Sequence, residues 1–312
     1  MTNKVSVILS TYTEERYESV VKCVDSLLKQ SLPPDQIILA VDSREELLNF
    51  YREKISGVEV VDRQGHSLSR ARNSGITRSV GDLVVFIDDD AYADVDWLKT
   101  LIAPFDDELV VSTGGRIEPD WAMGRPWWLP EELFWVVGCT YRGMPVDDSL
   151  IRNPIGCNMA FRKRVFDEIG FFNEDIGRIG FQLLGSEEME LCLRIPKANK
   201  DYRILYVPES VVHHQVPRSR SKFSYLLKRS YFEGASKAII GKLYPKNESD
   251  TTENHYLYYL IKTGIPSRFL KLYSYRAWGE LGALVASVAS VACGFLWTSL
   301  FSRKARDASW TK

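Results

Sequence analysis

The sequence predicts an α/β protein with a mostly parallel sheet, helices on both sheet faces and a C-terminal helical region. Short apolar runs alternate with segments of helical periodicity over residues 5–90. Within these runs apolar side chains occur on both faces, which is typical of parallel strands covered by helices on each side. The character of the chain then changes after residue 215. We therefore expect one domain over residues 1–215 and a helical region over 216–312.

Strand and helix signals follow each other in βαβα order through the first part of the chain. We expect strands at 5–12, 37–42, 58–63 and 82–90. We expect helices at 16–30, 45–55 and 67–79, where apolar residues recur at helical spacing. A mixed or antiparallel part of the sheet is expected near "NPIGCNMAFRKRVF", at 153–166.

Composition excludes several classes of protein. The 312 residues carry a net charge of −1, so no strong overall field indicates nucleic-acid binding. The five cysteines are scattered, odd in number and without a CxxC pair, which favours a reduced environment over a disulfide framework or a zinc site. The chain opens on a strand-like run, "MTNKVSVILST", so no signal peptide is expected.

Two C-terminal segments suggest contact with a membrane. Residues 281–300 carry no charge and are close to the length of about 20 residues that spans a bilayer. This segment is expected to be a transmembrane or in-plane helix, with a buried core helix as the alternative. Residues 218–242 mix basic and aromatic side chains, as in a basic amphipathic helix. They fit a helix on an anionic membrane surface or a solvated helix packed on the core.

An aromatic stretch lies in the middle of the sequence, at residues 125–138. "RPWWLPEELFWVVG" places Trp127, Trp128, Phe134 and Trp135 close together. Such side chains are typical of a hydrophobic core. A platform for a sugar ring or a lipid tail is the alternative that the sequence leaves open.

Polar residues gather where the predicted strands end, and the acidic run after "VVFI" is the most unusual of them. Asp88, Asp89 and Asp90 could form a solvated turn or cap a helix. Adjacent carboxylates repel each other, however, and a divalent cation such as Mg²⁺ or Mn²⁺ would relieve that repulsion. In parallel sheets ligands bind at the carboxyl ends of strands, where these residues are expected to lie.

The motifs "ILSTY", "AVD", "RARNSGI", "FIDDDA", "NPIGCNMAFRK" and "SEEMELCLR" together resemble the inverting glycosyltransferases of family 2, which have the GT-A fold. Each motif is weak alone, whereas their order and spacing over residues 3–215 are specific. "TGGRIEPDW", "RPWWLPEELFWVVGCTYRG" and "IRNPIGCNMAFRKRVF" further resemble the archaeal glucosyl-dolichyl phosphate glucuronosyltransferases of N-glycan assembly.

The resemblance implies roles for individual residues of the donor site. The residues implied to bind the donor are Thr11, Glu14, Asp42, Arg72, Asn73, Asp88 and Asp89. Thr11 and Asp42 would contact the nucleoside, and Arg72 and Asn73 the nucleotide or donor sugar. "FIDDDA" matches the DxD motif, in which Asp90 would bind the metal and Asp89 is the variable middle position. His213 or His214 in "VVHHQ" would complete the metal site, or they form a surface pair.

The resemblance also implies where the general base lies. The family has an aspartate at the position of Glu188 in "SEEMELCLR", so this chain departs from the pattern by one methylene group. Glu187 is the alternative base. Glu190 and Arg194 are spaced four apart and are expected to form an ion pair along a helix.

These implications define an inverting transfer of a sugar from a nucleotide sugar to a hydroxyl. UDP is the expected nucleotide, glucuronic acid or another hexose derivative the expected sugar, and a lipid-linked saccharide such as dolichyl phosphate-hexose the expected acceptor. The enzyme would act in protein N-glycosylation at the cell membrane, with its catalytic domain on the cytoplasmic side and Mg²⁺ or Mn²⁺ as cofactor. The rival hypotheses are an enzyme of cell-surface polysaccharide or glycolipid synthesis, and a catalytically silent subunit that binds nucleotide sugars.

Overall fold

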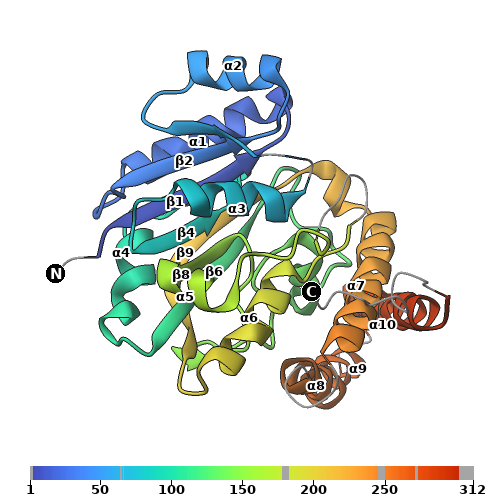
Figure 1. Cartoon of the computed structure of the whole chain (residues 1–312). Helices are drawn as coiled ribbons and strands as arrows, with labels where there is room; N and C mark the ends of the chain where they lie inside the picture. The colour runs from blue at the N-terminus through green and yellow to red at the C-terminus, as the bar shows by residue number, and fades with distance from the viewer. Residues whose placement is uncertain are drawn as a thin grey trace. The chain divides into compact units, whose positions relative to one another are not determined.

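The computed structural model describes residues 3–63, 65, 67–177, 183–244, 250–270 and 273–301 (Figure 1). Contacts divide the chain into two compact units. The first comprises Met1–Asp120, Pro145–Gly180 and Glu187–Gln215, and the second Trp121–Met144, Phe181–Ser186 and Val216–Lys312. One division between the units falls after residue 215. The aromatic stretch, in contrast, belongs with the C-terminal helices.

A mixed sheet of nine described strands forms the framework of the first unit. The strands are β1 Val5–Thr11, β2 Gln36–Val41, β3 Glu59–Asp62, β4 Leu83–Ile87, β5 Ala91–Ala93, β6 Val110–Trp121, β7 Ser149–Leu150, β8 Asn158–Arg162 and β9 Arg203–Val216. Their order is β3-β2-β1-β4-β8-β6-β9-β5, with β7 paired to β9. The strands β1 to β4 pair in parallel, and β8 runs antiparallel to β4 and β6. The predicted fold class is confirmed, including the antiparallel part near residues 153–166.

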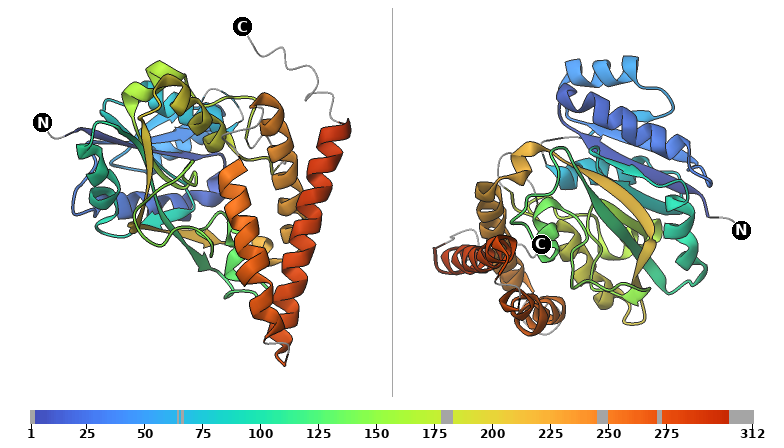
Figure 2. Two further views of the ribbon diagram at one scale, coloured as in Figure 1. Left: turned by 90° about the horizontal axis from the view of Figure 1, so that it is seen from below. Right: turned by 180° about the vertical axis from the view of Figure 1, so that it is seen from behind.

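Helices cover both faces of this sheet. They are α1 Tyr17–Leu28, α2 Glu45–Lys54, α3 Leu68–Arg78, α4 Trp97–Ile102, α5 Lys163–Ile169 and α6 Glu187–Ala198, with 3₁₀ turns η1 Glu14–Arg16 and η2 Ala103–Asp106. On one face, Ile76, Phe166 and Leu191 bring α3, α5 and α6 against the strand residues Ile8 and Phe86. Figure 1 shows α3, α5 and α6 in front of the sheet, and the view from behind in Figure 2 shows α1 on the other face.

The strand order creates a switch point between β1 and β4. The chain moves from β1 outward to β2 and β3, then returns through α3 to place β4 on the other side of β1. Because such crossovers are right-handed, the connections before and after the return lie on opposite faces of the sheet. A crevice therefore opens at the carboxyl ends of β1 and β4, which is where open α/β sheets bind ligands.

The second unit is built from the aromatic stretch and the C-terminal helices. Its elements are η3 Glu131–Val137, η4 Arg218–Ser221, α7 Phe223–Leu243, α8 Asp250–Tyr259, the π-helical turn η5 Leu260–Gly264, α9 Pro266–Phe269 and α10 Tyr275–Phe301. Leu133, Leu226, Leu260 and Leu284 form its core. Trp128, Phe134 and Trp135 pack against this core, as core side chains do. Trp127 remains 52% exposed.

Both C-terminal segments form helices, α7 and α10. Helix α7 buries Leu226, Ala235 and Ile240, so the basic stretch forms a helix packed on the core of its unit. Among the described residues one helix, α10, is long and apolar enough to cross a membrane, judged by length and composition. Membrane association is thus indicated for α10, and its orientation is taken up below.

Candidate active site

The candidate site lies at the switch point, where three parallel strands end in polar side chains. Thr11 closes β1, Asp42 follows β2, and the acidic trio follows β4 directly after Ile87. The Asp42 amide donates to the Thr11 carbonyl oxygen at 3.2 Å, which holds the first two strand ends together. The sheet therefore gathers residues that are far apart in sequence at one edge.

Asp88, Asp90 and His214 form a group that could hold a metal ion. One ligand atom from each lies within 4.8 Å of the others. Strand β9 supplies the histidine, because β5 pairs with β9 in a register that sets Ala91 opposite His214. The His214 Nε2 atom lies 3.2 Å from Asp90 Oδ1. Carboxylate oxygens with one imidazole nitrogen are a donor set suited to a divalent cation such as Mn²⁺.

His213 lies outside this group. Its ring stacks on Tyr92 with centroids 4.9 Å apart, and its Nε2 atom lies 2.9 Å from Asp94 Oδ1. Successive residues of a strand point to opposite faces, so only one of the two histidines can face the acidic trio. Of the two histidines, His214 is therefore the one that lies with Asp88 and Asp90.

We expect the His214→Gln variant to bind Mn²⁺ at least about tenfold more weakly, since even loss of an outer-shell partner has that effect. His213→Gln is the matched control and should bind Mn²⁺ normally. Titration followed by the electron paramagnetic resonance signal of free Mn²⁺ measures both variants. Equal weakening in the two variants would remove His214 from the metal site.

Arg16 is a member of the site that the sequence did not reveal. Its guanidinium pairs with Asp89 and lies 3.3 Å from Asp90 Oδ2. It also sits over the Tyr12 ring at 5.0 Å. The sequence offers little indication of this role, because a basic residue such as the one in "TEERY", shortly after a strand, is usually solvated.

Asp89, the middle residue of the trio, is buried, with a side chain 4% exposed. Burial raises the pKa of Asp89 above its ordinary value, and the neighbouring Asp90 and Asp88 raise it further, while Arg16 opposes the shift. The middle aspartate thus holds Arg16 against the strand end. The other two aspartates belong to the group with His214 that could hold a metal ion.

Arg72 links the acidic trio to the predicted base region. Its guanidinium lies 3.0 Å from Glu187 Oε1 and 4.0 Å from Asp88 Oδ1, and it donates to the Gly156 carbonyl at 3.3 Å. A Cβ atom at Gly156 would come within 2.6 Å of Arg72 Nη2, so a side chain there would displace the guanidinium. Arg72 is 4% exposed, so its charge acts within the site.

Asn73 and Glu14, the other two residues expected to bind the donor, differ in their surroundings. The Asn73 amide nitrogen donates to the Phe172 carbonyl at 2.9 Å, and its oxygen accepts from the Phe172 amide at 3.0 Å. Both ends of the side chain thus bind backbone, and Asn73 fixes the segment that leads toward α6. Glu14 is exposed in η1. Asp42, at the end of β2, is buried. Its carboxylate pairs with Arg63, and its Oδ1 atom lies 3.6 Å from Arg44 Nε.

The two candidate bases differ in their surroundings. Both lie in the first turn of α6, where the helix dipole favours negative charge. Glu187 is 5% exposed and forms an ion pair with Arg72, whereas Glu188 is half-buried.

The predicted ion pair along this helix is present, with Arg194 Nη2 3.0 Å from Glu190 Oε2. Ser186, just before the pair, has a left-handed backbone with φ of 77°, a strained state that is common at functional sites.

Comparison with known proteins identifies the family. The model of glycosyl transferase family 2 matches residues 6–170. The chain belongs to this family. This glycosyltransferase is 33% identical over 298 residues to the glucosyl-dolichyl phosphate glucuronosyltransferase of Haloferax volcanii, covering 94% of each chain.

Solved glycosyltransferases share the fold. GalNAc-T7, solved with UDP, GalNAc and Mn²⁺, has a TM-score of 0.52 and 18% identity, covering 84% of this glycosyltransferase and 56% of its own chain. The mannosyltransferase PcManGT of Pyrobaculum calidifontis, solved with GDP-Man and Mn²⁺, has a TM-score of 0.55 and 17% identity, covering 100% and 84%. These likenesses support the GT-A fold.

Proposed function

We propose that this glycosyltransferase moves a sugar from a UDP-sugar to a lipid-linked saccharide, with inversion at the anomeric carbon, in protein N-glycosylation. Dolichyl phosphate-hexose is the proposed acceptor class, and glucuronic acid or another hexose derivative the proposed sugar. The observation that carries this proposal is the relative that matches along 94% of both chains and is named for such a substrate. The proposed site of action is the cytoplasmic face of the cell membrane.

The proposed chemistry is one in-line displacement. The acceptor hydroxyl oxygen attacks the anomeric carbon, the bond from that carbon to the diphosphate oxygen breaks, and UDP leaves. Glu188 would take the proton of the hydroxyl, because an unassisted hydroxyl is a poor nucleophile. Arg72 would orient the donor between Asp88 and Glu187, which it already connects.

A divalent cation is the proposed cofactor, because the leaving group is a negatively charged diphosphate. Asp88, Asp90 and His214 would hold Mn²⁺ or Mg²⁺, and Mn²⁺ is favoured because imidazole is a better ligand for it than for Mg²⁺. When bound, the ion would neutralise the charge that develops on the diphosphate. Thr11 and Asp42 would contact the nucleoside from the neighbouring strand ends.

A donor screen tests the proposal. Purified protein is incubated with UDP-sugars and GDP-sugars in turn, with a lipid extract as acceptor and Mn²⁺ present, and the lipid products are analysed by mass spectrometry. We expect one UDP-sugar to add a hexuronic acid or hexose mass to a polyprenyl phosphate saccharide. Transfer to a polysaccharide or glycolipid alone would favour the first rival. Donor binding without transfer to any acceptor would favour the silent subunit.

A further inference from the structure

Helix α10 presents an uncharged face along most of its length. Val285 is 56% exposed, Leu296 57% and Leu300 60%, and Trp278 extends this face toward the helix start. Soluble surfaces rarely leave so long an apolar face uncovered. The helix is long enough to cross a bilayer, so its packing must decide whether it does so.

The opposite face of α10 is in backbone contact with α7. A Cβ atom at Gly294 would come within 1.9 Å of the Tyr231 carbonyl oxygen, and one at Gly234 within 2.0 Å of the Val291 carbonyl oxygen. Such close approach requires glycine on both helices and gives extensive van der Waals contact. The two helices are therefore joined over their middle turns.

Hydrogen bonds reinforce this contact along the two helices. The hydroxyl oxygens of Ser230 and Ser287 lie 2.8 Å apart. The Ser290 hydroxyl donates to the Leu227 carbonyl at 2.7 Å. Near the helix ends, Lys242 Nζ donates to the Ser299 carbonyl at 3.1 Å. Because the matched positions increase together along both helices, α7 and α10 run parallel.

Charged side chains of α7 lie level with the middle of α10. Arg229 Nη1 is 2.9 Å and Lys237 Nζ 3.3 Å from the Glu233 carboxylate, and Gly234 next to it meets α10 at Val291. Although burial opposes ionisation, Lys237 and Arg229 lower the pKa of Glu233 to about 2, so the triad stays charged. If α10 crossed a bilayer with α7 attached, this triad would enter the hydrocarbon, where charges are costly.

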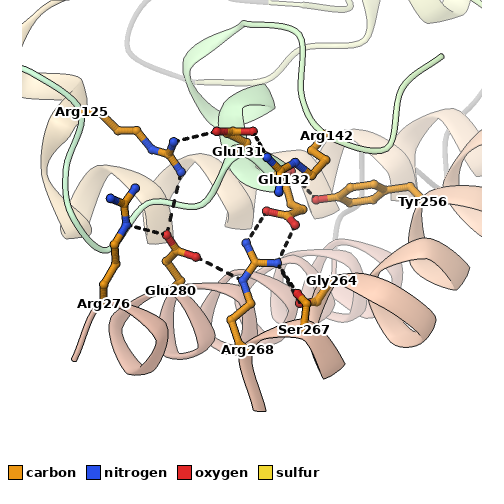
Figure 3. Close-up of polar contacts among 10 residues, drawn as sticks. All are labelled: Arg125, Glu131, Glu132, Arg142, Tyr256, Gly264, Ser267, Arg268, Arg276 and Glu280. Atoms are coloured by element: carbon orange, nitrogen blue, oxygen red, sulfur yellow. Dashed lines mark hydrogen bonds and ion pairs between the residues drawn. The ribbon is translucent and has the colours of Figure 1, made fainter. Parts of the chain in front are cut away.

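Ion pairs also fasten the first turns of α10 to the rest of the second unit. Figure 3 shows Arg268 of α9 between the carboxylates of Glu132 and Glu280. The Glu132 side chain is fully buried, and both of its oxygens accept from Arg268, at 2.6 and 2.7 Å. Glu280 of α10 lies 3.2 Å from Arg268 Nε and 3.0 Å from Arg276 Nε. These charges keep the start of α10 out of a hydrocarbon layer.

We propose that α10 lies in the plane of the membrane, with its uncharged face in one leaflet and α7 above it, and does not cross the bilayer. Exposed aromatic side chains toward both ends, Tyr275, Trp278 and Trp297, suit the interface between headgroups and acyl chains. Lys228 is exposed on α7 and complements anionic headgroups. The inference deepens the membrane association in the proposed function, and it can be tested without enzymatic turnover.

Three positions on one side of α10 distinguish the two orientations. Gly282, Cys293 and Leu300 are exposed and are 11 and 7 residues apart, close to three and two helical turns, so they share the outward face. Residues 282 and 300 are separated by about 27 Å along the helix axis. A side chain at Gly282 would meet no atom within 4 Å, so a cysteine fits there.

The experiment measures the depth of a spin label at each of these positions in the full-length protein on vesicles of phosphatidylcholine and phosphatidylglycerol. The variants are the native protein labelled at Cys293, and Gly282→Cys and Leu300→Cys, both with Cys293→Ala. The other four cysteines are buried, so the label is selective. Power saturation with oxygen and a water-soluble nickel chelate gives the depth of each label.

We expect the three labels to lie at one shallow depth. Depths that differ by most of the helix length, with labels 282 and 300 near opposite surfaces, would overturn the proposal in favour of a spanning helix. Labels that stay in water on vesicles would overturn it in favour of a protein partner on this face. Neither result depends on the donor or the acceptor, so a failure here is distinguishable from a failure of the proposed function.

A disulfide between the helices provides a second measurement. The Ser230→Cys/Ser287→Cys variant, with Cys293→Ala, places two thiols where the hydroxyl oxygens are 2.8 Å apart. Once oxidised, it should bind vesicles as tightly as its reduced form, because α10 need not leave α7. Loss of vesicle binding on oxidation, restored by reduction, would show that α10 must separate from α7 and would contradict the proposal.

Discussion

The Asp90→Asn variant should lose detectable sugar transfer and Mn²⁺ binding while remaining folded. Asp90 contributes an oxygen to the group formed with Asp88 and His214, and a neutral amide is a much weaker ligand for a divalent cation. The Asp90 carboxylate also lies 3.3 Å from Arg16 Nη1, and an asparagine side-chain oxygen can still accept a hydrogen bond from this guanidinium. The fold should therefore tolerate the change.

Asp96→Asn is the matched control for this variant. Asp96 follows the same loop, is exposed and accepts from Ser31 at 2.6 Å, away from the metal group. Circular dichroism checks folding, free-Mn²⁺ electron paramagnetic resonance checks binding, and UDP release checks turnover. Normal turnover of Asp90→Asn would mean that the trio is a solvated turn.

Replacing Glu188 with glutamine should lower kcat by about 10²–10⁴-fold, the usual contribution of a general base. The KM for the donor should stay unchanged. The ion pairs of Arg72, which would orient the donor, are made with Asp88 and Glu187, and the substitution leaves both of these carboxylates in place.

Glu187→Gln provides the comparison. This change weakens a buried ion pair and leaves Arg72 without its nearest carboxylate, so it should raise the donor KM and lower the melting temperature. A larger loss of kcat in Glu187→Gln than in Glu188→Gln, with an unchanged donor KM, would identify Glu187 as the base.

The framework of the site could be predicted because local sequence determines it. Continuous apolar runs that end in Thr11, Asp42 and Asp88 indicate buried strands, and parallel strands must bring these ends to one edge. The predicted pair of Glu190 and Arg194 likewise depends on helical spacing alone.

The remaining features of the site and fold could not be predicted from the sequence, because they depend on contacts between segments that are far apart in it. "VVHHQ" alternates in a strand, but only its pairing with β5 decides that His214 faces Asp90. Arg16 becomes part of the site because η1, the turn after β1, brings its guanidinium beside Asp89 and Asp90, more than 70 residues later. The Asn73 amide likewise binds the backbone of Phe172, 99 residues later. The aromatic stretch joins the C-terminal helices through Glu132 and Arg268, 136 residues apart.

The position of Arg16 has a consequence for the protein without its metal. Its guanidinium already balances Asp89 and lies beside Asp90, so the strand end carries a permanent internal counter-ion. Chelation should then switch activity off without unfolding the chain, and added Mn²⁺ should restore it fully. Such an enzyme should withstand purification and storage in chelator, and its activity should follow changes in metal supply reversibly.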